Sequence, residues 1–129
     1  LEGSTLSDDP DFARRLDEVE VRLEAIQFTE FRIMAALSKG QNPGPESSIM
    51  KTLGADMGQH IAELGAEVLG YYAAVHQPNA RTIGHNDEAI GPKAGLANFS
   101  QYFNLRASSI AGGSNEVQRN IMAKLVLGL

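Results

Sequence analysis

Residues 7–40 read SDDPDFARRLDEVEVRLEAIQFTEFRIMAALSKG and predict one long helix. Asp8 or Asp9 is a suitable N-cap, because a short carboxylate side chain accepts a hydrogen bond from the first free backbone N–H groups. Pro10 suits the first helical turn, where its missing N–H costs nothing. Gly40 is typical of the residue that follows the last turn of a helix.

The apolar residues of this helix, expected over residues 9–39, form two stripes. The first alternates steps of four and three residues, the spacing of a coiled-coil seam, and only Glu30 breaks its apolar character. Its members are Phe12, Leu16, Val19, Leu23, Ile26, Glu30, Ile33 and Leu37. The second stripe consists of Val21, Phe28, Phe31 and Ala35. A helix with two apolar stripes needs more than one neighbour, so one stripe suits a subunit interface.

Glu30 occupies a position in the first stripe, where neighbouring side chains are apolar. A buried charge needs a partner. We therefore expect Glu30 to be a buried structural carboxylate, paired with Lys51, Arg106 or Arg119.

Three further helices are expected downstream. One spans residues 45–70, after a proline-rich turn that prevents helix before it. The others span residues 93–108 and 115–127, the last with Ser114 as its N-cap. No segment alternates with period two, so no strand is expected. The pattern predicts an all-α antiparallel four-helix bundle in a single domain of 129 residues.

The second helix contains Gly54, Gly58 and Gly65, each unfavourable in a helix interior. Small residues there permit close approach, either by another helix or by a bulky ligand. His60 on the same helix is expected to be half-buried. A long polar loop follows and contains His76 and His85, which we expect to be solvated, since no neighbouring residue has metal-ligand spacing.

Composition excludes several classes of protein. The net charge of −5 argues against nucleic acid and anionic membrane surfaces as partners. The chain has no cysteine, which excludes disulfides and zinc–thiolate sites. No apolar run has the length of a membrane span and no signal peptide is visible, so a cytoplasmic protein is expected. The sequence opens without an initiator methionine, which suggests a piece of a longer protein.

Residues 111–114, Ala-Gly-Gly-Ser, form a turn directly before the last expected helix. A helix N-terminus carries unpaired N–H groups and a partial positive charge, and glycines before it let a ligand approach the backbone. The segment is therefore either an anion-binding site or a tight turn between helices, capped by Ser114.

The closing segment SSIAGGSNEVQRNIMAKLVLGL resembles the C-terminal signature of the acyl-CoA dehydrogenase family. That signature reads Gly-Thr-Ser-Glu-Ile-Gln-Arg and continues as an apolar helix ending Leu-Gly-Leu. Residues 113–119 follow it, with replacements such as Ser114 for threonine and Val117 for isoleucine. DDPDFARRLDEVEVRLEAIQFTEFR and NPGPESSIMKTLGADMGQHIAELGAEVLG resemble two long helices of the family's C-terminal bundle.

The resemblance implies the bundle domain of a larger flavoenzyme whose N-terminal helical domain and middle β-domain lie outside this chain. The parent would use FAD to oxidise an acyl-CoA thioester between its α- and β-carbons, would pass electrons to an acceptor, and would be a homo- or hetero-oligomer, either a dimer or a tetramer. The resemblance assigns FAD contacts to Ser114, Asn115 and Glu116. It places Gly112 and Gly113 beside the acyl thioester.

The chain departs from the family pattern at two places. Many members carry a catalytic glutamate at the position of Gly112, and glycine cannot act as a base. The base is then either on an earlier helix of the parent or lost, as in a silent subunit of a hetero-oligomer. The segment Glu67 to Tyr71 stands where the family often has Gln-Ile-Leu-Gly-Gly, which touches the flavin of a neighbouring subunit and so implicates Glu67 and Gly70. Here Glu67 replaces the usual glutamine and Tyr71 replaces the last glycine. Both departures fit a branch that degrades sterol or other bulky acyl-CoA. An assembly module without catalysis is the alternative.

Overall fold

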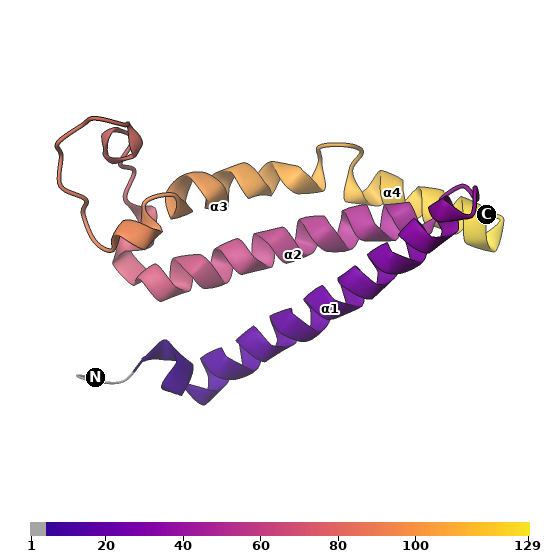
Figure 1. Cartoon of the computed structure of the whole chain (residues 1–129), viewed down its shortest axis with the longest axis horizontal. Helices are drawn as coiled ribbons and strands as arrows, with labels where there is room; N and C mark the ends of the chain where they lie inside the picture. Colours follow the sequence, from indigo (N-terminus) through magenta and orange to yellow (C-terminus); the bar gives the residue numbers. More distant parts are fainter. Residues whose placement is uncertain (1–4) are drawn as a thin grey trace. The chain divides into compact units, whose positions relative to one another are not determined.

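Four α-helices form the framework of the computed structural model, which describes residues 5–129 (Figure 1). They are α1 (Pro10–Ser38), α2 (Glu46–Leu69), α3 (Asn98–Arg106) and α4 (Asn115–Met122). Short 3-10 segments flank them: η1 (Leu6–Asp8), η2 (Gly70–Ala74), η3 (Asn79–Arg81), η4 (Lys93–Gly95) and η5 (Ala107–Ser109). A π-helical turn, η6 (Ala123–Leu127), follows α4. Residues 5–129 contain no strand, and the all-α expectation is confirmed.

The chain divides into two compact units. The first comprises the residues up to Met57 together with Ser109–Leu129, and the second comprises Gly58–Ser108. The division falls inside α2, where no break in the sequence pattern predicts it. Over the residues described, no helix has both the length and the hydropathy needed to span a membrane.

Helix α1 begins as its sequence predicts. The Asp9 carboxylate accepts hydrogen bonds from the backbone N–H groups of Asp11 and Phe12, at 2.8 and 3.2 Å. Asp9, not Asp8, is therefore the N-cap; Asp8 belongs to η1. The helix ends before Gly40, whose φ of +75° closes the turn at little cost.

The apolar stripes of α1 are mostly uncovered within this chain. Only Phe12 and Val19 of the first stripe are buried. Val21, Phe28 and Phe31 of the second stripe are all exposed. The expectation for Glu30 is wrong, because its side chain is exposed and the seam it interrupts is open to solvent. Two of the cations expected to pair with it bond elsewhere: Lys51 donates to Asn115, and Arg106 pairs with Glu63 at 2.9 Å.

In the second unit, α3 lies antiparallel to the C-terminal half of α2. A Cβ built on Gly58 would lie 3.7 Å from Leu105, and one built on Gly65 would lie 3.1 Å from the Asn98 side-chain oxygen. Two of the three helical glycines thus face a neighbouring helix. The Gln59 amide also donates to the carbonyl of Leu105, at 3.1 Å, at the end of α3.

The region expected as one helix over residues 93–108 is broken. It starts as η4, continues as α3 only from Asn98, and tightens into η5. Gly95 lies against Leu69, and a Cβ built there would come within 2.5 Å of that side chain. Close packing of this glycine, together with its low helix propensity, accounts for the interruption.

Candidate functional site

The turn before α4 has the backbone conformation that only glycine adopts readily. Gly112 has φ +70° and Gly113 has φ +93°. Both angles lie in the left-handed region, which glycine adopts at little cost. A Cβ built on Gly112 would meet no atom within 4 Å, so the backbone at this residue is open to an approaching group.

Gln118 closes over the other side of the same turn. Its side-chain amide donates to the Gly112 carbonyl oxygen at 3.2 Å. A Cβ built on Gly113 would lie 2.7 Å from the same amide nitrogen, so this glycine leaves the room that the glutamine occupies. Glycine therefore suits the two positions for different reasons: the side-chain position of Gly112 faces open space, and that of Gly113 is taken up by Gln118.

The N-terminus of α4 is capped by its own side chains. Ser114 is the N-cap, with extended backbone, and its hydroxyl oxygen accepts a hydrogen bond from the Val117 N–H at 3.4 Å. The backbone N–H of Glu116 and the Ser114 hydroxyl lower the pKa of the Glu116 carboxyl below its ordinary value of 4.5. A carboxylate at this position is also favoured by the positive end of the helix dipole.

Asn115 is buried, with 6% of its surface exposed, and its side chain bonds on both sides to α2. Its side-chain oxygen accepts from the Lys51 ammonium at 2.9 Å, and its side-chain nitrogen donates to the Asp56 carboxylate at 2.9 Å. Lys51 also donates to the Ser109 carbonyl at 3.3 Å. The sequence did not predict Lys51 and Asp56 as partners of Asn115. Two residues that are five positions apart on a helix do not share a face, so no pattern marks them.

The six other residues of the predicted site fall into two groups. Gly112, Gly113, Ser114 and Glu116 lie together around the turn, beside Asn115. Glu67 and Gly70 belong to the second unit, at the end of α2 and the start of η2, and both are exposed. Tyr71, which replaces the usual glycine, is fully exposed next to them.

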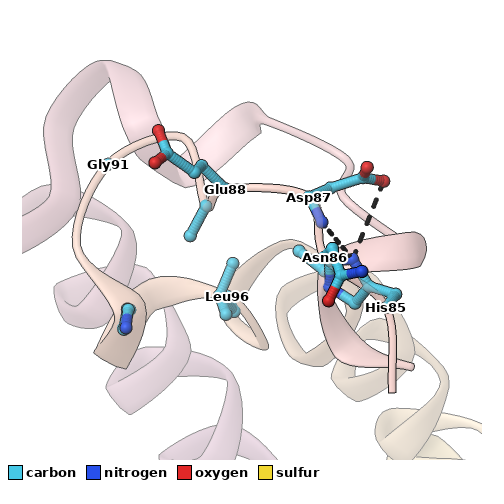
Figure 2. A pocket seen from close by; sticks show the side chains of 9 residues that line it. His85, Asn86, Asp87, Glu88, Gly91 and Leu96 are labelled. Carbon is cyan, nitrogen blue, oxygen red and sulfur yellow. Dashed lines mark hydrogen bonds and ion pairs between the residues drawn. The ribbon is translucent and has the colours of Figure 1, made fainter. Parts of the chain in front are cut away.

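The long loop of the second unit lines an open hollow of about 550 Å³. Figure 2 shows His85 folded against Asp87 at its rim. The His85 Nδ1 accepts from the Asp87 N–H at 2.8 Å and lies 3.7 Å from the Asp87 carboxylate. The expectation of a solvated His85 is wrong, because its side chain is largely covered. The His76 ring packs against Phe99 with the centroids 5.0 Å apart and the ring planes tilted by 48°.

The residues described contain no group of three or more metal-ligating side chains close enough to hold an ion. The acidic residues of the loop, Asp87 and Glu88, line the hollow without converging on one point (Figure 2). The open turn at the start of α4 therefore stands out as the candidate site.

Comparison with known proteins identifies the family of this turn and of the helices around it. The family model for the C-terminal domain of acyl-CoA dehydrogenases matches residues 1–127. The chain belongs to the acyl-CoA dehydrogenase family. It is 32% identical over 123 residues to the acyl-CoA dehydrogenase IpdE1 of Mycobacterium tuberculosis (strain ATCC 25618 / H37Rv), covering 95% of this chain and 28% of that protein.

The fold also matches a solved member of the family. The structure described as the Tcur3481-Tcur3483 steroid ACAD superposes with a TM-score of 0.73 at 22% sequence identity, over 96% of this chain and 30% of that one. This match confirms the fold class. The acyl-CoA dehydrogenase domain described here therefore spans less than a third of either relative.

Proposed function

We propose that this chain is the C-terminal bundle domain of an FAD-dependent acyl-CoA dehydrogenase that oxidises an acyl-CoA thioester between its α- and β-carbons. The observation that carries the proposal is the open backbone at Gly112, directly before the N-terminus of α4. Family membership supports the reaction type. The domain would contribute one edge of the flavin site and part of the oligomer core.

The residues present fit one edge of a flavin site. The side-chain position of Gly112 is open, and the first N–H groups of α4 lie immediately beyond it. Such a helix end favours a negatively charged or hydrogen-bond-accepting group. The Ser114 hydroxyl and the Glu116 carboxylate flank that position and would contact the cofactor. When bound, FAD supplies the acceptor for the hydride that leaves the substrate.

Residue 112 does not supply the catalytic base in this proposal. A glycine leaves room for substrate but cannot take the α-proton. The base would come from a part of the parent outside this chain. A full-length Gly112→Glu variant should then lose turnover by crowding; a gain of turnover would show instead that the parent has no base of its own.

We infer a bulky acyl-CoA, of the kind derived from sterols, as the substrate class. The vacant side-chain position at Gly112 supports this inference, as does the description of the solved relative as a steroid ACAD. The paired designation of that relative, Tcur3481-Tcur3483, supports a hetero-oligomeric parent.

The test is flavin content and substrate-dependent reduction of the full-length protein that carries this domain. We expect a stoichiometric flavin whose visible absorbance bleaches when a sterol-derived acyl-CoA is added without oxygen. The 129-residue chain by itself should retain little or no FAD through gel filtration, because it holds only one edge of the site. A full-length protein that folds and binds no flavin, either alone or with co-expressed partner subunits, would refute the proposal.

The alternative is a helical assembly module or a catalytically silent subunit of a hetero-oligomeric dehydrogenase. The exposed second stripe of α1 favours an assembly role. A parent that oligomerises normally but neither binds flavin nor responds to acyl-CoA, with or without co-expressed partner subunits, would support this alternative.

A further inference from the structure

The bonds around Asn115 join the start of α4 to α2 inside the first unit. Asn115 is the first residue of α4 and one of the few buried polar side chains in the described chain. It accepts from Lys51 and donates to Asp56, each at 2.9 Å. We call these three residues the α4 anchor.

We propose that the α4 anchor is a positioning device that holds the N-terminus of α4, and with it the open turn at Gly112, in a fixed orientation. Asn115 was expected to contact the cofactor, but its side chain is turned into the protein and both ends of its amide are engaged. The residue acts on the site through the backbone of its neighbours Ser114 and Glu116. The consequence for flavin rests on the proposed function; the positioning itself does not.

The chemistry of the anchor explains why an amide stands at this position. An amide side chain offers an acceptor to the ammonium and a donor to the carboxylate at once. Hydrogen bonds to charged groups are stronger than neutral ones, and truncating one partner leaves a buried group unsatisfied. Lys51 also bonds to the Ser109 carbonyl, so one ammonium joins the residues on both sides of the turn.

Exchanging the amide and the carboxylate gives a direct test. Asn115→Asp would place two carboxylates within hydrogen-bonding distance and remove the donor to Asp56. In Asp56→Asn, the new amide can still accept from Asn115. The double variant restores one amide, one carboxylate and the ammonium, with the hydrogen bond between positions 56 and 115 reversed. The cycle therefore isolates the interaction from the two separate substitutions.

The helix dipole alone makes the opposite prediction for the effect of Asn115→Asp on α4. An aspartate in the first turn interacts favourably with the helix dipole. If the anchor had no role, this change would leave α4 unaffected or stabilise it. Asn120→Asp, the same change at an exposed position of α4, is the matched control.

Amide hydrogen exchange separates local loosening from loss of global stability. The Gln118 N–H donates to the Ser114 carbonyl at 2.9 Å and reports on the first turn of α4. The Gln101 N–H donates to the Ala97 carbonyl at 2.9 Å and reports on α3. We expect Asn115→Asp to speed exchange at Gln118 relative to Gln101 by roughly 10- to 100-fold, the range for a lost bond to a charged group. Asp56→Asn and Asn120→Asp should change the ratio by less than about threefold.

The double variant should return the exchange ratio to within about threefold of the wild-type value. An unchanged ratio in Asn115→Asp, or no recovery in the double variant, would overturn the anchor. Equal acceleration at Gln118 and Gln101 would also overturn it, because it would show that Asn115 supports only global stability.

The same variants in the full-length protein test the link to flavin. We expect the Kd for FAD to rise at least about tenfold in Asn115→Asp and to recover in the double variant. Suppose that the exchange ratio changes in Asn115→Asp and recovers in the double variant, but the Kd for FAD does not. The α4 anchor would then stand, and its proposed effect on the flavin site would be wrong. A wild-type parent that binds no FAD would contradict the proposed function, with the exchange result unaffected.

Discussion

Helices α1 and α4 of the first unit differ in the kind of contact that their sequences provide. Helix α1 has 29 residues and the longest run of apolar stripes in the chain, yet most of its apolar side chains are exposed. Helix α4 has eight residues, and its first residue is buried and bonded to two charged side chains of α2. A strong hydrophobic pattern thus identifies a face that needs covering but does not supply the cover, whereas one well-placed amide can fix a short helix.

The largest expected effect separates Phe12, at the start of α1, from Phe28, in its second stripe. Phe12→Ala should lower the free energy of unfolding by about 3–5 kcal/mol, because Phe12 is buried with 5% of its surface exposed. Phe28→Ala, at 64% exposure, should change it by no more than about 0.5 kcal/mol. Urea unfolding of the two variants measures the difference. Equal losses would show that the second stripe is covered and that the contrast with α4 is false.

The next effect concerns what covers the second stripe of α1. We expect the chain to self-associate through this face, so Phe28→Ser with Phe31→Ser should weaken association at least about tenfold, or roughly 1.4 kcal/mol. Sedimentation at tens of micromolar, an order-of-magnitude range for a modest interface, measures it. Ile83→Ser, which removes an exposed side chain from the loop, is the control. A wild-type chain that sediments only as a monomer would show that α1 needs a different partner.

A smaller effect tests the turn that the α4 anchor is proposed to hold. Gly112→Ala should cost about 1–2 kcal/mol, because the residue keeps φ at +70°. Gly54→Ala in α2 should instead add about 0.5–1 kcal/mol, since its Cβ would meet no atom within 4 Å and alanine favours a helix. Urea unfolding measures whether each variant lowers or raises the free energy of unfolding. A stabilising Gly112→Ala would show that the turn is free to change its conformation.

The smallest effect is the pH dependence of the α4 cap. The pKa of Glu116 is lower in the folded chain than its ordinary value of 4.5, so its stabilisation is present above pH 4.5 and disappears as the pH falls through the folded pKa. Glu116→Gln should therefore lower the Tm slightly near about pH 6, and the difference should shrink as the pH falls below 4.5 and through the folded pKa. Asp8→Asn, before α1, should behave similarly, because Thr5 lowers the pKa of Asp8. A Tm difference that persists in acid would exclude the carboxylate as its cause.

Local patterns predicted the helices well because their signals lie within a few residues of the structure they specify. Asp9, Pro10 and Gly40 define the ends of α1, and Ser114 caps α4 as expected. The break at Gly95 was missed, since it depends on a contact with Leu69, 26 positions earlier in the chain. Glu30 was misplaced for a related reason: periodicity shows that side chains share a face and not whether that face is covered.

The sequence by itself determined the all-α class, the caps, the glycine turn before α4 and the resemblance to acyl-CoA dehydrogenases. Each depends on short-range spacing or on a contiguous motif. Only the tertiary structure decided that Asn115 is buried between Lys51 and Asp56, that Gln118 covers Gly113 and that Gly112 remains open. The partners of Asn115 lie about 60 positions away and five residues apart on α2, a spacing that no helical pattern marks. A buried polar network is specified by the packing of two elements, so it becomes visible only when those elements are brought together.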